Sequence, residues 1–335
     1  MEYAGAVAIM GKVWKDGVPV DTPVDEDTLK DLVEDPKMLV WIDLCGVTAD
    51  ELQSIGGALK LDAHSLEDTQ SLRERPKAVR FDGYTFTTIY GAKLGRPAKG
   101  QHRVHLARVS AYALPTCLLT VRRNSQFDMD PVVDRWRGDP KLAGFGVDGL
   151  LQGLLDVAID QQFEVLQGLD DDAEALIDQV FVDRPNLREL QKKTFAVRRE
   201  LVELRRVVPP MRDVVSTLMR AGSIAHTWSS ELLTYYEDLN DHTLRATEWL
   251  DNLRDLVSSI FETNLALNDN QMNDAMKRLA GWAAIIAVPT LVTGWFGQNI
   301  PYPGFSNVYG LIQAAVLVIG GVLVLFVIFR RKGWI

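Results

Sequence analysis

The side chains that could do chemistry in this 335-residue chain are oxygen ligands rather than nucleophiles. The five histidines have no spacing typical of a zinc site, and Cys45 and Cys117 stand apart in apolar stretches without a CxxC pattern. There is no nucleophile beside a base, no metalloprotease motif and no GxxxxGK[ST] loop for ATP. The sequence therefore does not predict an enzyme, and its carboxylate and amide oxygens suit a hard cation such as Mg²⁺.

The charges of the chain are distributed very unevenly. There are 36 Lys and Arg against 45 Asp and Glu, a net charge of −9, yet the 51 residues from Leu279 to Phe329 contain none of these four types. This division excludes a simple soluble enzyme and a disordered chain. The excess of negative charge argues against nucleic acid as a partner.

The uncharged block contains two apolar runs, Leu279–Phe296 with 18 residues and Val308–Phe329 with 22. About 20 residues of helix are needed to cross a bilayer, so both runs are predicted to span one. A buried hairpin of a soluble protein is the alternative, but the second run has no polar face beyond Gln313. Basic residues flank the block and are absent from the loop inside it, which places both chain ends in the cytosol and the loop outside a plasma membrane. The flanking residues are Lys277, Arg278, Arg330, Arg331 and Lys332.

The residues before the block are predicted to form one cytosolic body with a net charge of −12, from 33 Lys and Arg against 45 Asp and Glu. Its first part, to about residue 145, is predicted to be mixed α/β, and Thr48-Ala-Asp-Glu51 fits a capping box before a short helix. Val, Thr, Tyr and Phe are frequent in its strand candidates. These are Met38–Leu44, Ala78–Phe81, Tyr84–Lys93, Arg103–Leu114 and Cys117–Arg122.

From about Val147 the apolar residues recur every three to four positions, which predicts long helices. One helix is predicted from Leu187 through Val208, where two prolines interrupt it. Another is predicted from Ser229 to Phe296, 68 residues and roughly 100 Å of continuous helix. A helix of this length needs partner helices. The predicted division is 1–145 α/β domain, 146–278 helical stalk, 279–299 first transmembrane helix, 300–307 external loop, 308–329 second transmembrane helix and 330–335 basic cytosolic tail.

Several segments resemble the CorA family of divalent-cation channels. The end of the first span, Gly294-Trp-Phe-Gly-Gln-Asn299, is similar to the Gly-Met-Asn signature of that family. Tyr235–Val257 resembles its stalk helix, Asn273–Leu279 its entry into the membrane, and Leu66–Tyr84 part of its N-terminal domain. The resemblance covers nearly the whole chain and implies a homopentamer with a funnel-shaped cytosolic domain and a central pore.

The resemblance implies an ion filter at the outer mouth of the pore, formed by Gly297, Gln298 and Asn299. Neutral oxygens there would recognise hydrated Mg²⁺, which loses its water reluctantly. From the residues alone, Asn299 could equally cap the helix end. The pore face implied by the family is Asn273, Met276, Leu279, Ala283, Ala287, Thr290 and Gly294, with Met276 and Leu279 as a hydrophobic gate.

Two departures from the family pattern leave the transported ion open. Gln298 replaces the usual Met, and the outer loop lacks the acidic residues that the magnesium branch carries. Mg²⁺ is the expected ion, with Co²⁺ or Ni²⁺ also transported and the membrane potential as the driving force. The alternative is a zinc transporter of the same fold, with or without proton coupling.

The resemblance also implies regulatory Mg²⁺ bound between subunits, so that high cytosolic Mg²⁺ closes the channel. Its ligands would be Glu67 and Asp68 facing Asp238 of a neighbouring stalk, with Glu262 closer to the membrane. The alternative for all four residues is that they are ordinary charged side chains on solvent-exposed helix surfaces and bind no metal. The basic residues at the inner interface would form a collar, which membrane anchoring explains equally well.

Overall fold

The computed structural model describes residues 8–22, 32–98, 101–182, 186–224, 228–298, 301–305 and 307–335, with the side chains of 8, 9, 96–98, 101 and 224 left out. The chain divides into two compact units. The first unit comprises Met1–Pro185 and Glu189–Ile260, and the second comprises Asn186–Arg188 and Phe261–Ile335. The domain boundaries predicted above were drawn from patterns in the sequence, whereas these units are defined by compactness. The predicted boundaries therefore stay a prediction.

A seven-stranded mixed sheet forms the centre of the first unit, in the order β2-β1-β3-β7-β6-β5-β4. Strands β3 and β7 pair in parallel and the other neighbours pair antiparallel. The five predicted strands are confirmed. The strands are β1 (Ala8–Lys15), β2 (Val18–Val20), β3 (Met38–Cys45), β4 (Lys77–Phe81), β5 (Tyr84–Ala98), β6 (Gln101–Ala113) and β7 (Cys117–Arg122).

Strands β1 and β2 were not predicted, although the sequence carries a signal for them. The hairpin turns at Asp16-Gly17, and both residues have a positive φ, 51° and 79°. An Asp-Gly pair between apolar residues is the pattern that favours a tight hairpin, because both central residues must adopt left-handed angles that bulky residues resist.

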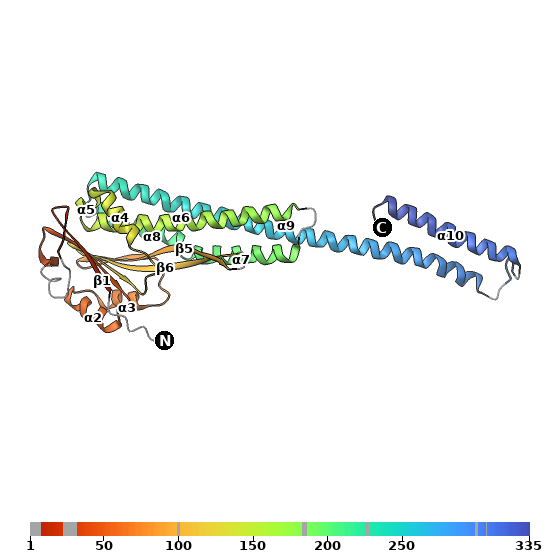
Figure 1. Cartoon of the computed structure of the whole chain (residues 1–335), viewed down its shortest axis with the longest axis horizontal. Helices are drawn as coiled ribbons and strands as arrows, with labels where there is room; N and C mark the ends of the chain where they lie inside the picture. The colour runs from red at the N-terminus through yellow and green to blue at the C-terminus, as the bar shows by residue number, and fades with distance from the viewer. Residues whose placement is uncertain are drawn as a thin grey trace. The chain divides into compact units, whose positions relative to one another are not determined.

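Helices cover both faces of the sheet (Figure 1). On one face, α2 and α3 close a core that contains Ile42, Leu52 and Tyr112. On the other face, α4, α5, α6 and α8 (Val208–Ile224) close a second core around Trp41, Trp136 and Leu154. The helices here are α2 (Ala49–Ala58), α3 (Ala63–Gln70), α4 (Asp130–Gly138), α5 (Pro140–Gly144) and α6 (Val147–Val180). The capping box at Thr48 is confirmed, with its hydroxyl accepting from the Glu51 amide.

The remaining helices are α7 (Leu187–Arg205), α8 (Val208–Ile224), α9 (Ser230–Phe296) and α10 (Val308–Arg331). The prediction that one helix continues to Val208 is wrong, because α7 ends at Arg205 and α8 begins at Val208. Pro209 and Pro210 lie in the first turn of α8, where the missing amide protons cost no helical hydrogen bond. The 67-residue α9 confirms the predicted long helix to within one residue.

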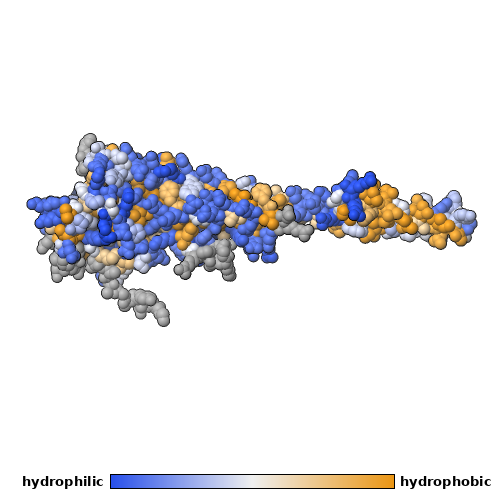
Figure 2. Space-filling view, turned by 45° about the horizontal axis from the view of Figure 1, so that its top comes forward, coloured by the Kyte–Doolittle hydropathy of each residue, from blue (hydrophilic) through white to orange (hydrophobic). Residues whose placement is uncertain are grey.

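The uncharged block forms the end of α9 and nearly all of α10. Both helices contain a stretch long and apolar enough to cross a membrane. Figure 2 shows hydrophobic residues gathered over these C-terminal segments, whereas hydrophilic residues dominate the surface of the first unit. The two predicted spans therefore coincide with continuous helices.

A buried ion pair joins the two parallel strands at the middle of the sheet. The Arg122 guanidinium on β7 donates to the Asp43 carboxylate on β3, with Nη2 2.5 Å from Oδ2 and Nε 3.1 Å from Oδ1. Thr120 Oγ1 donates to the same carboxylate at 2.7 Å. Both charged side chains are almost completely buried, so neither can turn to water if its partner is lost.

We predict that Arg122→Ala lowers the free energy of unfolding by about 3–5 kcal/mol, because it leaves the Asp43 carboxylate buried without its counter-ion. Thermal and chemical unfolding of the full chain in detergent would measure this. Arg123→Ala, at the exposed next residue, is the control and should change little. Equal effects of the two substitutions would contradict the prediction.

Candidate functional site

The end of α9 and α10 form an antiparallel hairpin within the second unit (Figure 1). Small residues allow the two helices to approach closely. A Cβ added at Gly321 of α10 would lie 2.8 Å from Val288 Cγ1, and one added at Gly281 of α9 would lie 3.3 Å from Ile335. Ile285 of α9 is only 7% exposed. Gly281, Ile285 and Val288 therefore mark the face of α9 that packs against α10.

The residues predicted to line a pore are all exposed to solvent in the single chain. Met276 is 61% exposed and Leu279 is 72% exposed, which is unusual for large apolar side chains. Ala283, Ala287 and Thr290 line a shallow apolar groove together with neighbouring side chains of α9. The α9–α10 hairpin thus leaves this whole face of α9 uncovered, and its role as a pore lining stays a prediction.

Hydroxyl groups on the last turns of α9 bond to the helix backbone. Thr290 Oγ1 donates to the Ile286 carbonyl at 3.2 Å, and Thr293 Oγ1 donates to the Pro289 carbonyl at 2.8 Å. Such bonds are common where proline interrupts the backbone ladder of a membrane helix. The Thr290 oxygen keeps lone pairs that can accept from a water on the exposed face.

Helix α9 ends just before the predicted filter residues. The Gly297 amide donates to the Thr293 carbonyl at 2.9 Å, and the Gln298 amide donates to the Trp295 carbonyl at 3.3 Å. A Cβ at Gly297 would lie 2.9 Å from the Thr293 oxygen, so a side chain there would crowd the helix end. Gln298 is exposed. Asn299 lies outside the described residues.

An aromatic cluster connects the end of α9 to the loop that follows. The Phe296 and Tyr302 rings meet edge to face with centroids 4.9 Å apart, and Tyr302 contacts Phe305 in the same way at 5.3 Å. The backbone turns at Gly304 with φ +95° and comes close to Gly310, where a Cβ would lie 2.4 Å from the Gly304 oxygen. The described part of the loop is therefore held against both helix ends.

Of the predicted regulatory carboxylates, Asp68 already has a cationic partner. Its Oδ2 lies 2.7 Å from Lys77 Nζ, which also contacts Glu74 Oε1 at 2.9 Å. Burial alone would lower the pKa of Lys77, but the hydrogen bonds to Asp68 and Glu74 outweigh it, so the pKa is raised. Glu67, the preceding residue on α3, is exposed.

Asp238 and Glu262 both lie on α9 and are exposed. The Asp238 carboxylate is 3.8 Å from His242 Nε2, which is an ion pair only when the histidine is protonated. Burial raises the pKa of Asp156 and of Asp160 on α6, and in each case His242 opposes the shift. Sequence reasoning did not single out these two aspartates, although their four-residue spacing puts them on one helix face.

The predicted regulatory residues do not form a metal cluster within one chain. Among the described residues, no three His, Cys, Asp or Glu side chains gather closely enough to hold an ion. The prediction placed these ligands on opposite sides of a subunit boundary, so a single chain does not test it.

The predicted basic collar lies in the second unit. Lys277 pairs with Asp274 at 3.0 Å, whereas Arg278, Arg330, Arg331 and Lys332 are exposed and form no ion pair with described residues. The chain turns back after α10 at Gly333, and the Trp334 ring stacks on Phe329 with centroids 5.3 Å apart. Four positive charges therefore remain free to interact at this end of the hairpin.

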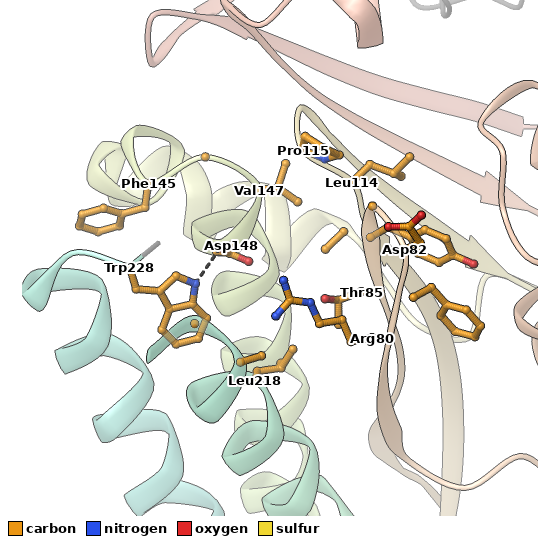
Figure 3. A pocket seen from close by; sticks show the side chains of 17 residues that line it. Arg80, Asp82, Thr85, Leu114, Pro115, Phe145, Val147, Asp148, Leu218 and Trp228 are labelled. Atoms are coloured by element: carbon orange, nitrogen blue, oxygen red, sulfur yellow. Dashed lines mark hydrogen bonds between the residues drawn. The ribbon is translucent and has the colours of Figure 1, made fainter. Parts of the chain in front are cut away.

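A pocket of about 440 Å³ lies in the first unit, between the β4–β5 hairpin, the start of α6 and α8. Figure 3 shows the Arg80 guanidinium pointing into it, and Trp228 Nε1 donating to Asp148 Oδ2, a bond of 2.7 Å. Burial raises the pKa of Asp148, and the indole bond opposes this shift. None of the predicted site residues lines the pocket.

Comparison with known proteins agrees with this architecture. A family model described as "CorA-like Mg2+ transporter protein" matches residues 36–331. The cobalt/magnesium transport protein CorA of Thermotoga maritima is 29% identical over 300 residues, covering 88% of this chain and 83% of that protein. The zinc transport protein ZntB of Yersinia pseudotuberculosis is 26% identical over 277 residues, covering 78% and 77%. The structure of the CorA magnesium transporter from Methanocaldococcus jannaschii superposes with a TM-score of 0.73 at 23% identity, covering 98% of this chain and 100% of that one.

We predict that Gly321→Leu destabilises the α9–α10 hairpin, because the new side chain must displace Val288. Overpacking of this kind costs about 1–3 kcal/mol. Gly320→Leu is the matched control, since a Cβ at Gly320 meets nothing within 4 Å. Thermal unfolding of the full chain in detergent should show a lower midpoint for Gly321→Leu only, and equal midpoints would contradict the described packing.

Proposed function

The chain belongs to the CorA-like Mg²⁺ transporter family, and we propose that it conducts divalent cations, chiefly Mg²⁺, across a cell membrane. Family membership confirms the expected fold class, an α/β N-terminal unit followed by long helices and two apolar C-terminal helices. It also confirms that the chain is a membrane protein and not an enzyme. The basic flanks support the proposed orientation, with both ends in the cytosol of a multi-pass plasma-membrane protein.

The uncovered face of α9 is the observation that carries this proposal. It combines exposed apolar side chains with Thr290 on a membrane-length helix that ends next to Gly297, Gln298 and Asn299. Lipid could cover an apolar face, but the groove there contains the small residues Ala283 and Ala287 beside larger apolar side chains. Small residues let helices approach closely, which suits packing around an axis. One hairpin cannot enclose a pore, so several copies must assemble, and we propose a homopentamer with a funnel-shaped cytosolic part.

In this assembly, five copies of Asn299 and the Gly297 carbonyls would present neutral oxygens to a hydrated cation at the outer mouth. Mg²⁺ holds its water tightly, so recognition through the water shell is favoured over direct coordination. Met276 and Leu279 would narrow the inner part of the pore, where apolar side chains can gate by excluding water. The basic collar of Lys277, Arg278, Arg330, Arg331 and Lys332 would surround the cytosolic side.

The membrane potential is sufficient to drive uptake. Moving one charge through 100 mV changes the free energy by about 2.3 kcal/mol, so a divalent cation gains about 4.6 kcal/mol. Uptake of Mg²⁺, Co²⁺ or Ni²⁺ therefore needs no coupled ion.

Zinc transport is the second candidate function. Gln298 and the outer loop without acidic residues support it, because both depart from the pattern of the family's magnesium branch. The match to the Yersinia zinc transport protein supports it as well, although the Thermotoga cobalt/magnesium protein matches a longer segment at higher identity.

We further propose that cytosolic Mg²⁺ bound between subunits favours the closed state. Glu67, Asp68, Asp238 and Glu262 supply carboxylate oxygens, which are ligands that Mg²⁺ accepts. Three of these side chains are exposed in the single chain and are available to a neighbour, whereas Asp68 is partly covered by Lys77. Carboxylates that meet across an interface repel each other until a divalent cation bridges them, which links ion binding to assembly.

We predict that Asn299→Ala abolishes potential-driven Mg²⁺ uptake into liposomes, because the filter loses its amide oxygens. Asn307→Ala, which removes an amide from the same outer loop, is the control and should retain most of the flux. Mg²⁺ and Zn²⁺ uptake would be followed with an imposed potential, with and without a pH gradient. Zinc uptake that requires the pH gradient, with no Mg²⁺ uptake, would overturn the main proposal in favour of the second.

We predict that the double variant Asp68→Ala with Asp238→Ala loses inhibition by Mg²⁺ on the cytosolic side. Flux through oriented proteoliposomes would be measured against internal Mg²⁺ concentration. Asp82→Ala with Glu237→Ala removes two exposed carboxylates of the same unit and should leave inhibition intact. Unchanged inhibition in the first double variant would show that the bridging ligands are assigned incorrectly.

A further inference from the structure

Lys77 holds the Asp68 carboxylate in the position where the proposed regulatory cation would bind. Its ammonium lies 2.7 Å from Asp68 Oδ2 and 2.9 Å from Glu74 Oε1. The three side chains are only 20–28% exposed, so water screens this triad less than it screens an ion pair on an open surface. A divalent cation that approaches Asp68 therefore meets a carboxylate that is already paired with an ammonium group, which it shares with Glu74.

The backbone around this triad is fixed by bonds to the sheet. The Arg108 guanidinium on β6 donates to the Ser71 carbonyl at 2.6 Å and to the Thr69 carbonyl at 2.5 Å. The Tyr90 hydroxyl on β5 donates to the Glu74 carbonyl at 2.5 Å. Lys77 itself begins β4 and pairs with Thr88. The segment between α3 and β4 is thus tied at several points, and the fold imposes the contact between Lys77 and Asp68.

The other proposed regulatory carboxylates have no such partner among the described residues. Glu67 takes part in no ion pair there, and the ion pair of Asp238 is with His242, at 3.8 Å. Of the four proposed regulatory carboxylates, Asp68 is therefore the one that Lys77 contacts. Since Asp68 is covered and Glu67 is exposed on the same helix, the two neighbouring carboxylates are not equivalent as ligands.

From this geometry we propose that Lys77 is a tethered competitor of Mg²⁺, which sets how much cytosolic Mg²⁺ is needed to load Asp68. The inference rests on the proposed regulatory role of Asp68 and adds a second residue to it. A cation that binds Asp68 must displace the ammonium or tolerate its repulsion, so the affinity of the site is lower than its carboxylates alone would give. The channel therefore stays open to a higher internal Mg²⁺ concentration than it would without this lysine.

The test compares Mg²⁺ binding to the purified full-length variants Lys77→Met and Lys93→Met by titration calorimetry. Lys77→Met removes the competing charge, and we expect Mg²⁺ to bind about tenfold more tightly, within the usual range of coupling between sites. Lys93→Met removes an exposed charge from β5 and should bind as the unaltered protein does. The Mg²⁺ concentration that gives half of the rise in melting temperature provides a second readout, independent of transport.

Further variants separate the possible failures. Lys77→Arg keeps the charge and should bind Mg²⁺ as weakly as the unaltered protein. Lys77→Gln keeps a hydrogen-bond donor and replaces Lys77→Met if that variant does not fold. Asp68→Asn combined with Lys77→Met should cancel the gain in affinity.

Unchanged Mg²⁺ affinity in both neutral Lys77 variants would overturn the tethered competitor. If Asp68→Asn alone also leaves Mg²⁺ binding unchanged, the proposed regulatory site is itself wrong. If Asp68→Asn weakens binding while the neutral Lys77 variants do not strengthen it, the site stands and only the role of Lys77 fails.

Discussion

The structure depends on one constraint, which is that a two-helix hairpin can cover only one face of α9. The covered face of α9 carries Gly281, Ile285 and Val288, and α10 packs closely against it. The opposite face keeps Met276 and Leu279 exposed. In a membrane, the face of a helix that does not pack against its partner must be covered in another way. Either lipid or further copies of the same helix can cover it. Thr290 lies on this uncovered side, and the proposed assembly would cover it with further copies of the chain.

Charged residues are distributed unevenly between the apolar hairpin and the rest of the chain. The apolar hairpin carries no charged residue between Leu279 and Phe329, so an ion in the proposed pore would meet only dipoles there. The residues before Leu279 are strongly acidic, and basic residues flank the uncharged block on both sides. In the first unit, the charges that are buried are paired, as Asp43 and Arg122 are. The carboxylates of Glu67 and Asp238 are exposed and can be reached by a cation from solvent. Asp68 lies between these two groups, because its carboxylate is partly exposed and also paired with Lys77.

Much of the fold could be predicted from sequence because its signals are local. The apolar, β-branched run at Met38–Leu44 and the three-to-four spacing after Val147 give strand and helix directly. The β1–β2 hairpin was missed although Asp16-Gly17 marks it, and the end of α7 was placed too late because the two prolines begin α8 rather than end α7. For the site, the candidate residues came from a family resemblance, and the sequence gives no means of pairing Asp68 with Lys77. That contact depends on how the chain turns from α3 into β4, which is fixed by Arg108 and Tyr90 from distant strands.

The end of α9 separates two kinds of position that lie side by side in the sequence. Gly297 is bonded to the last turn, and any larger residue would press on the Thr293 carbonyl, so natural variation at this position is restricted by sterics. Gln298 is exposed and lies beyond the helix, so its side chain can be exchanged while the helix stays as it is. Evolution can therefore explore different residues at 298 by single substitutions, and members of one family can diverge there without rebuilding the membrane helices.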